Sequence, residues 1–202
     1  MNSKGANYLR YADSGVADLN VVGASYGPGG DGARIAYITA PCEFGLILIG
    51  ATAHGICWLG IHKCAAYLES ELSRDFPQAE ILHDDDALTE LSSNIVRLLV
   101  KPISLDLPID IRATPFQLAV WRELCTIPRG ATRSYLEIAY RLGKPGGARA
   151  VGRANGSNPL ALLIPCHRAV GSDGNLTGYR WGLEYKRRLL DYERVLNTTS
   201  SR

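Results

Sequence analysis

The sequence predicts an α/β (α+β) domain on the N-terminal side and a mainly α domain on the C-terminal side. Its 202 residues suffice for one or two domains with hydrophobic cores. In the first half, short apolar runs with β-branched residues are separated by Gly, Pro and Thr, which is typical of strands. In the second half, apolar residues recur at helical spacing behind helix-capping residues.

Four segments are expected along the chain. Residues 15–32 are rich in Gly, Asp and Ser and include a Gly-Pro-Gly-Gly run, which is typical of a poorly ordered segment. Thr114 is a good helix cap and Pro115 suits the first helical position, so the pair opens a new domain. We therefore expect a flexible arm or linker over 1–32, an N-terminal domain over 33–112, a C-terminal domain over 113–197 and a tail over 198–202.

The N-terminal domain is predicted to combine an antiparallel sheet with two helices. Strands are expected at four apolar runs, 34–40, 45–49, 55–59 and 105–111. Apolar residues four apart predict a helix that begins near Cys64 and is stopped by Pro77, and Asp86 is expected to cap a second helix. The acidic surface of this domain suggests a scaffold.

The C-terminal domain is predicted to contain a helix-turn-helix. Ser134 and Glu137 have the spacing of a capping box, and the helix that they open ends near Gly143. A second short helix follows, starting at position 147 or 148 and ending at about Asn155. Two short helices around a turn that contains glycine are typical of a helix-turn-helix.

Charge divides the chain in a similar way. The net charge of +2 combines 7 Lys and Arg with 14 Asp and Glu in residues 1–110, and 15 with 6 in residues 111–202. A basic half favours an anionic partner such as nucleic acid, although an ordinary solvated surface is the alternative. The second short helix favours DNA, because small residues beside Arg149 and Arg153 allow a close approach to a DNA backbone. Tight packing on another helix is the alternative here.

The main candidate for a reactive centre is the pair Cys166-His167. It follows an apolar run, 160–164, that we expect to be a buried strand or extended segment. A neighbouring histidine can help a cysteine to become a thiolate nucleophile; the alternative is an inert buried cysteine. A helix is predicted over 182–196, and Glu193 falls on its apolar face, where a carboxylate needs a partner such as His167 unless it reaches water. Thiol, imidazole and carboxylate in series would form an activated nucleophile.

No cofactor, metal site or membrane span is expected. None of the five cysteines forms a CxxC pair, and Cys57, His62 and Cys64 lack the paired short spacings of a structural zinc site. We expect the cysteines of the first domain to be small core residues. No run of 18 apolar residues occurs and the N-terminus lacks the pattern of a secretory signal, so a cytoplasmic location is the default.

Five stretches of the second domain carry a family resemblance: FQLAVWRELCTIPRG, SYLEIAYRLGKP, ARAVGRANGSNP, LLIPCHR and DGNLTGYRWG. Through them, residues 116–193 resemble the C-terminal domain of the O6-alkylguanine-DNA alkyltransferases, the methylated-DNA–protein-cysteine methyltransferases, and particularly the Ada type. The PCHR box followed by GYRWG is highly specific. The resemblance extends back to ARIAYITAPCEFG and LDLPIDIRAT, so it covers nearly all of residues 33–196.

The resemblance implies a ribonuclease-H-like sheet in the first domain, and a helix-turn-helix and an active-site loop in the second. It implies direct-reversal DNA repair, in which an alkyl group moves from O6 of guanine onto Cys166 once per molecule. His167 would take the thiol proton through a water, Glu193 would orient His167, Asn158 would brace the site, and Tyr135 would donate to the guanine ring. The resemblance leaves open whether O4-alkylthymine is also a substrate.

The resemblance also implies that a monomer binds double-stranded DNA through its minor groove and flips the damaged nucleotide out of the helix. Arg149 would fill the gap in the base stack. The remaining DNA contacts would come from Ala148, Ala150, Gly152, Arg153 and Ser134, with Ala154 as a further small residue at the close approach. The pocket for the base and the alkyl group would be formed by Tyr179, Arg180, Trp181 and Pro165.

Three positions depart from the family pattern: Ala113 stands where Gly is frequent, Ala131 where Glu is common and Ala169 where Val is common. Three other functions are weighed. A lesion-binding protein without transfer chemistry lacks the acceptor cysteine, which this chain keeps as Cys166. A methylation-responsive regulator, acting by itself or as a piece of a split Ada system, is another alternative, although this sequence lacks the four-cysteine zinc domain and a complete regulatory helix-turn-helix. A cysteine hydrolase usually draws its Cys and His from distant segments.

Overall fold

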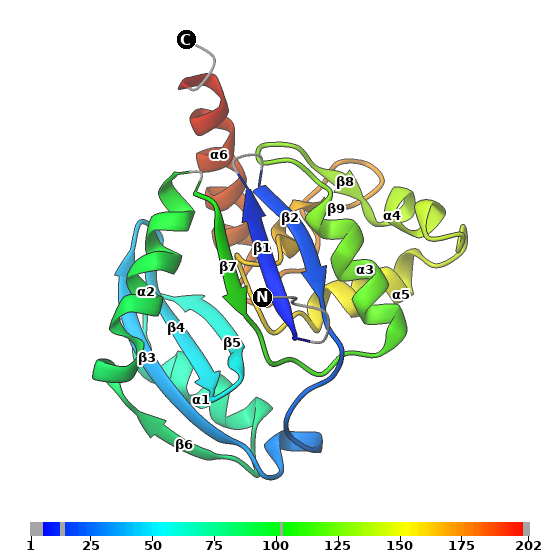
Figure 1. Ribbon diagram of the computed structural model, residues 1–202. Coiled ribbons are helices and arrows are strands. Elements are labelled where there is room, and N and C mark those ends of the chain that lie inside the picture. The colour runs from blue at the N-terminus through cyan, green and yellow to red at the C-terminus, as the bar shows by residue number, and fades with distance from the viewer. Residues whose placement is uncertain (1–5, 13–14, 102, 200–202) are drawn as a thin grey trace.

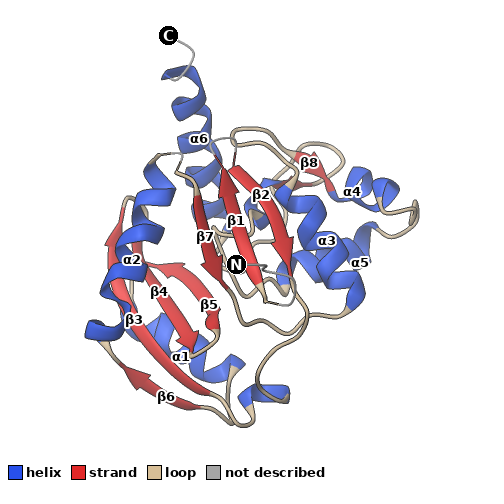
Figure 2. Ribbon diagram, viewed as in Figure 1, coloured by secondary structure: helices blue, strands red, loops and turns tan. Residues whose placement is uncertain are grey.

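The computed structural model describes residues 6–12, 15–101 and 103–199 (Figure 1). It has an α/β N-terminal part and a mainly helical C-terminal part, which confirms the expected fold class (Figure 2). Among the described helices, none combines the length and the apolar character needed to cross a bilayer.

A four-stranded sheet forms the centre of the N-terminal part, in the order β5-β4-β3-β6. Its strands are β3 (Arg34–Cys42), β4 (Gly45–Thr52), β5 (Gly55–His62) and β6 (Glu80–His83). The first three run antiparallel, as predicted, and β6 joins β3 in parallel. The parallel edge strand was not expected, because only two of the residues 80–83 are apolar. In the structure three of the four are exposed.

Two helices pack against this sheet. Helix α1 (Ala65–Asp75) contacts β4 and β5, helix α2 (Asp85–Val100) contacts β3, and Figure 1 shows the two helices on opposite sides of the sheet. The cap of α2 is Asp84, which accepts from the amide of Ala87 at 3.1 Å, so the prediction of Asp86 is wrong. Three successive aspartates offer the same chemistry, and only the backbone geometry selects the first.

The flexible arm predicted for residues 1–32 is wrong over most of its described part. Strands β1 (Tyr8–Ala12) and β2 (Gly15–Asn20) form a hairpin that pairs with β7 (Leu105–Pro108) in the order β2-β1-β7. Leu9 and Tyr11 alternate toward a buried face, as strand residues do. The prediction rested on the glycine-rich composition of residues 15–32, so the alternation of apolar residues in the preceding strand was overlooked. Strand β7 is also shorter than the predicted 105–111, because it ends at Pro108.

The C-terminal part begins as the sequence predicts. Thr114 and Gln117 form a capping box at α3 (Pro115–Cys125), and Ser134 and Glu137 form another at the start of the next helix. Helices α4 (Tyr135–Arg141) and α5 (Ala148–Gly156) are packed on each other, as in a helix-turn-helix. The remaining elements are β8 (Arg133–Ser134), the 3-10 turns η1 (Pro28–Gly30) and η2 (Cys166–Arg168), β9 (Ala169–Val170) and α6 (Leu183–Thr199).

The apolar segment 160–164 joins the two parts. It is fully buried but turns rather than extending, and Leu162 has a φ of 69°. Leu59 of β5 donates to the Pro159 carbonyl at 2.8 Å and accepts from the Ala161 amide at 3.0 Å. The edge of the N-terminal sheet therefore fixes the backbone that leads into Cys166.

Candidate active site

A pocket of about 430 Å³ opens between α4, the end of α5 and the loop before α6. Cys166 lies in its wall and is only 5% exposed. The other lining residues are Tyr135, Gly152, Asn155, Gly156, Asn158, Thr177, Gly178, Tyr179, Arg180 and Trp181. The pocket therefore gathers the predicted acceptor, Asn158, Tyr135 and the loop 179–181 from segments far apart in the sequence.

Asn158 holds the thiol and the backbone around it. Its Nδ2 donates to Cys166 Sγ at 3.1 Å and to the carbonyl of Ile164 at 2.9 Å, while its Oδ1 accepts from the Leu160 amide at 3.0 Å. Burial raises the pKa of the Cys166 thiol, and the Asn158 donor and the charge of Lys186 act in the opposite direction. The resting thiol is therefore protonated at neutral pH and needs a base to react.

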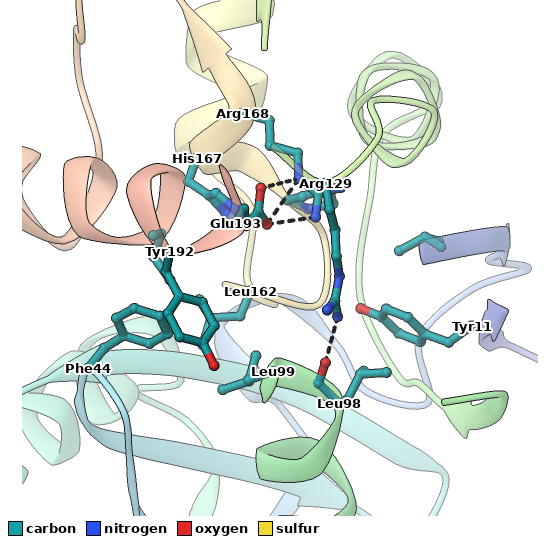
Figure 3. A pocket seen from close by; sticks show the side chains of 13 residues that line it. Tyr11, Phe44, Leu98, Leu99, Arg129, Leu162, His167, Arg168, Tyr192 and Glu193 are labelled. Atoms are coloured by element: carbon teal, nitrogen blue, oxygen red, sulfur yellow. Dashed lines mark hydrogen bonds and ion pairs between the residues drawn. The ribbon is translucent and has the colours of Figure 1, made fainter. Parts of the chain in front are cut away.

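Behind Cys166, His167 is paired with Glu193 of α6. His167 Nε2 lies 2.9 Å from Glu193 Oε1, and both side chains are buried. The sequence also placed these two residues together, but it did not predict the other partners of the carboxylate. Arg168 contacts Glu193 through Nε and Nη2, the latter at 2.7 Å (Figure 3). The Gly130 amide donates to Glu193 Oε2 at 3.0 Å.

The electrostatics assign a tautomer to His167. Burial alone would raise the pKa of Glu193, but the adjacent His167 and Arg168 hold it well below its usual range, so the carboxylate is ionised and can only accept. Burial lowers the pKa of His167 more than Glu193 raises it, so the ring is neutral at neutral pH. The proton must then sit on Nε2, facing Glu193. Nδ1 is left as a buried acceptor with no hydrogen-bond partner among the described residues.

Lys186 is a residue of the site that sequence reasoning missed. Its Nζ donates to the carbonyls of Thr177 at 2.8 Å and Gly178 at 3.1 Å, and lies 3.4 Å from the hydroxyl of Tyr135. Burial lowers the pKa of Lys186 to about 8. The signal was present, because Lys186 shares the apolar face of α6 with Leu190 and Glu193. Tyr135 in turn donates to Thr177 at 3.1 Å.

Two predicted site residues lie elsewhere. Pro165 does not line the pocket; it borders a separate cavity of about 40 Å³ on the side of His167 and Glu193, together with Tyr11 and Leu162 (Figure 3). Ser134 is buried, and its hydroxyl is engaged with Glu137 in the cap of α4 rather than free to contact DNA. A capping box uses up its own hydroxyl, which explains why both roles could not hold.

Helix α5 presents two exposed arginines, Arg149 and Arg153. Ala148, Ala150 and Gly152 are partly exposed, and Gly152 also borders the pocket. Ala154 is buried under α3, where its carbonyl accepts from Trp121 Nε1 at 2.8 Å, so it belongs to the helix packing and not to an outer face. The small residues of α5 therefore serve both alternatives: those on the outer side leave room for a close approach to DNA, and Ala154 on the inner side packs against another helix. Among the described residues, no cluster of His, Cys, Asp or Glu is arranged to bind a metal ion.

Comparisons with known proteins find methyltransferases that act on methylated DNA. Residues 115–195 match the family model described as the DNA-binding domain of 6-O-methylguanine DNA methyltransferase. An inducible methylated-DNA–protein-cysteine methyltransferase of Bacillus subtilis (strain 168) is 41% identical over 148 residues, which are 72% of this chain and 83% of that protein. The bifunctional transcriptional activator/DNA repair enzyme Ada of Escherichia coli (strain K12) is 39% identical over 189 residues. These are 93% of this chain but 52% of Ada, so the chain spans about half the length of that relative.

Solved structures agree in fold. A crystal structure of the O6-methylguanine methyltransferase of Mycobacterium tuberculosis superposes with a TM-score of 0.61 at 34% identity, covering 80% of this chain and 93% of that one. A structure described as Mycobacterium tuberculosis OGT in complex with DNA gives a TM-score of 0.60 over the same shares.

Proposed function

The chain belongs to the methylated-DNA–protein-cysteine methyltransferase family, and we propose that it repairs O6-alkylguanine in double-stranded DNA by transferring the alkyl group irreversibly to its own Cys166. One observation carries this proposal. The Cys166 thiol borders an open pocket, and its neighbour His167 is paired with the buried Glu193 of α6. Such an arrangement supplies a nucleophile, a base and an orienting carboxylate.

The first step is removal of the thiol proton. The free lone pair of His167 Nδ1 accepts it, through a bridging water as in the family, and the imidazolium that results is stabilised by Glu193. Asn158 Nδ2 and the charge of Lys186 favour the thiolate that is left. Arg168 and Gly130 keep the carboxylate of Glu193 in place throughout.

The thiolate then attacks the alkyl carbon. The S–C bond forms while the C–O6 bond breaks, and the bonding pair passes to the purine. Tyr135 borders the pocket, and its hydroxyl proton, which the Thr177 carbonyl accepts in the resting protein, can turn to the guanine ring as the ring gains this charge. The proton that His167 took from the thiol returns by way of water to the purine and restores neutral guanine. The product is a thioether, so each molecule is consumed by one transfer.

Access to O6 requires the nucleotide to leave the duplex. Helix α5 supports binding in the minor groove, because its partly exposed small residues let the backbone approach and Arg149 projects into solvent, where it can enter the base stack. We also propose that the protein acts as a monomer, because one chain is sufficient to assemble the thiol, its base and the pocket. The substrate would be met in the cytoplasm and, in a bacterial cell, at the nucleoid, where the DNA lies.

Mass spectrometry tests the proposal. Incubation with a duplex that carries O6-methylguanine should add one methyl group per molecule, located on Cys166, and Cys166→Ala should gain none. Cys64→Ser, which alters an exposed cysteine, should behave like the wild type. Binding of the lesion without modification of Cys166 would favour a lesion-binding protein, and many turnovers per molecule would favour a hydrolase or another catalyst.

A further inference from the structure

Arg180 of the pocket loop is bound by two carboxylates of the N-terminal domain. Its Nη2 lies 3.1 Å from Glu71 Oε2 and its Nη1 lies 2.7 Å from Asp75 Oδ2. Both acids belong to α1, and Glu71 is almost completely buried, with 6% of its side chain exposed. A guanidinium paired on both terminal nitrogens is not free to bind a substrate, although Arg180 borders the pocket.

The same arginine packs against two tryptophans. Its guanidinium carbon lies 5.0 Å from the ring centroid of Trp181 and 5.8 Å from that of Trp58, and the two indoles meet edge to face at 5.4 Å. Trp58 Nε1 donates to Asp75 at 2.8 Å. Gly60 makes room for this packing, because a Cβ there would lie 2.5 Å from Trp58 and 2.6 Å from Trp181. Acids, arginine and indoles thus form one cluster between α1, β5 and the loop.

Resting on the function proposed above, we infer that Glu71 and Asp75 are positioning residues of the base pocket. By holding Arg180 they fix Trp181, which lines the pocket, and thereby limit the size of the alkyl group that the pocket admits. The N-terminal domain then does more than support the fold. It sets the position of one wall of a pocket whose reacting atoms all belong to the C-terminal domain.

The physical basis is the cost of moving a buried charge. Arg180 cannot leave the carboxylates without losing charge-assisted hydrogen bonds in a partly desolvated place. The ion pairs of Arg180 therefore hold the loop against α1. Neutralising one carboxylate weakens this contact. The indole of Trp181 can then move aside, so that a larger alkyl group enters the pocket. Methyl transfer needs no such movement.

A competition assay in one tube tests this inference. The protein is mixed with equal amounts of two duplexes, one with O6-methylguanine and one with O6-benzylguanine, and the two adducts on Cys166 are counted by mass spectrometry. Because both adducts form on the same folded molecules, their ratio does not depend on how much of a variant is folded. We expect Asp75→Asn and Glu71→Gln each to raise the benzyl-to-methyl ratio about fivefold.

Two controls make the role of the cluster specific. Glu90→Gln, which neutralises an exposed acid on α2, should leave the ratio at the wild-type value. In an Arg180→Gln background, Asp75→Asn should raise the benzyl-to-methyl ratio little further, because both changes act on the same ion pair. Quenching of tryptophan fluorescence by acrylamide should rise in Asp75→Asn as Trp58 and Trp181 become more accessible.

The outcomes separate this inference from the function on which it rests. Normal methyl transfer with an unchanged ratio in both acid variants would overturn the inference alone. A fivefold change in Glu90→Gln would also overturn it, because the effect would then be one of general surface charge. A wild-type protein that transfers neither group would overturn both the proposed function and the inference.

Discussion

At the scale of single residues, the site depends on how one carboxylate is surrounded. Glu193 accepts from His167, Arg168 and the Gly130 amide, and the contacts with His167 and Arg168 are buried. The sequence predicted the pair of Glu193 with His167, because a carboxylate on an apolar helix face needs a partner. It could not predict Gly130 or the part of Arg168, since both arrive through tertiary folding. Lys186 was missed although the helical-face argument that was used for Glu193 applies to it as well.

Glu193→Gln should therefore impair both chemistry and stability. Without the negative charge, the imidazolium form of His167 is no longer stabilised, and we expect the single-turnover rate of methyl transfer to fall about 100-fold. Arg168 loses its ion pair in a buried place, which should lower the free energy of unfolding by about 3 kcal/mol. Rapid-quench kinetics and urea unfolding measure the two effects.

Asp191→Asn is the matched control for that variant. Asp191 lies on the same helix but is exposed, and it pairs with Arg194 at the surface. Its removal should change the free energy of unfolding by less than about 0.5 kcal/mol and leave the rate unchanged. An equal loss in both variants would mean that α6 responds to any lost charge, and the role given to Glu193 would be wrong.

The depressed pKa of His167 makes a prediction about pH. An unfolded histidine takes up a proton at a pH of about 6.5, whereas the buried ring resists it. Between the lowered pKa and about pH 6.5 the unfolded chain therefore binds more protons, so the free energy of unfolding decreases as the pH falls through this window. The transfer rate, which needs the neutral ring, should still hold at about pH 6.5 and decline only below it.

Urea unfolding and single-turnover rates across this range check both parts. The difference in stability between wild type and His167→Asn isolates the contribution of this one ring, because the other titrating groups are shared. A rate that already halves at about pH 6.5 would show that the His167 pKa is not depressed.

At the scale of elements, most local signals within one helix were reliable, although the cap of α2 was predicted two residues too late. The cap at Thr114 and the capping box at Ser134 were predicted from neighbouring residues, and the structure contains both. Elements made by long-range pairing were harder. Strand β1 also pairs with β7, about a hundred residues later, and no local pattern specifies such a partner. Arg180 was placed in the pocket by motif alone, and its carboxylate partners lie more than a hundred residues away.

The prediction about DNA binding concerns Arg149 of helix α5. If Arg149 fills the base stack, its loss should slow methyl transfer most on DNA in which unstacking the damaged base is costly. We expect Arg149→Ala to slow methyl transfer about tenfold on a fully paired duplex, and much less when the damaged guanine lies in a single strand that needs no extrusion. Single-turnover rates on the two substrates give the comparison.

The control for this variant is Arg187→Ala, which removes an exposed arginine from α6. In Arg187→Ala, the rate of methyl transfer should fall only slightly, and equally on both substrates, because one positive surface charge is lost. If Arg149→Ala slowed both substrates equally, Arg149 would act only through phosphate attraction, and its part in extrusion would be disproved.

At the scale of the whole molecule, the N-terminal hairpin connects the two parts. Its β1 strand completes a sheet with β7, and the hydroxyl of Tyr11 donates to the carbonyl of Leu163, within the segment that leads to Cys166. Arg122 of α3 donates to the carbonyl of Leu19 in β2 at 3.0 Å. Together with Leu59 of β5, these contacts make the reactive segment dependent on residues from the first hundred. We therefore expect one cooperative unfolding transition.

Leu9→Ala tests that dependence. Leu9 is completely buried in β1, so truncation should leave a cavity and lower the free energy of unfolding by about 2–5 kcal/mol. Val22→Ala, at a residue that is 70% exposed just after the hairpin, should cost less than about 0.5 kcal/mol. If the hairpin is integral, the Leu9 variant unfolds in a single transition at lower urea, and reaction of the Cys166 thiol with a disulfide reagent coincides with that transition. Thiol exposure at the wild-type midpoint, after an earlier loss of strand signal, would instead show a hairpin that unfolds independently and leaves the reactive segment intact.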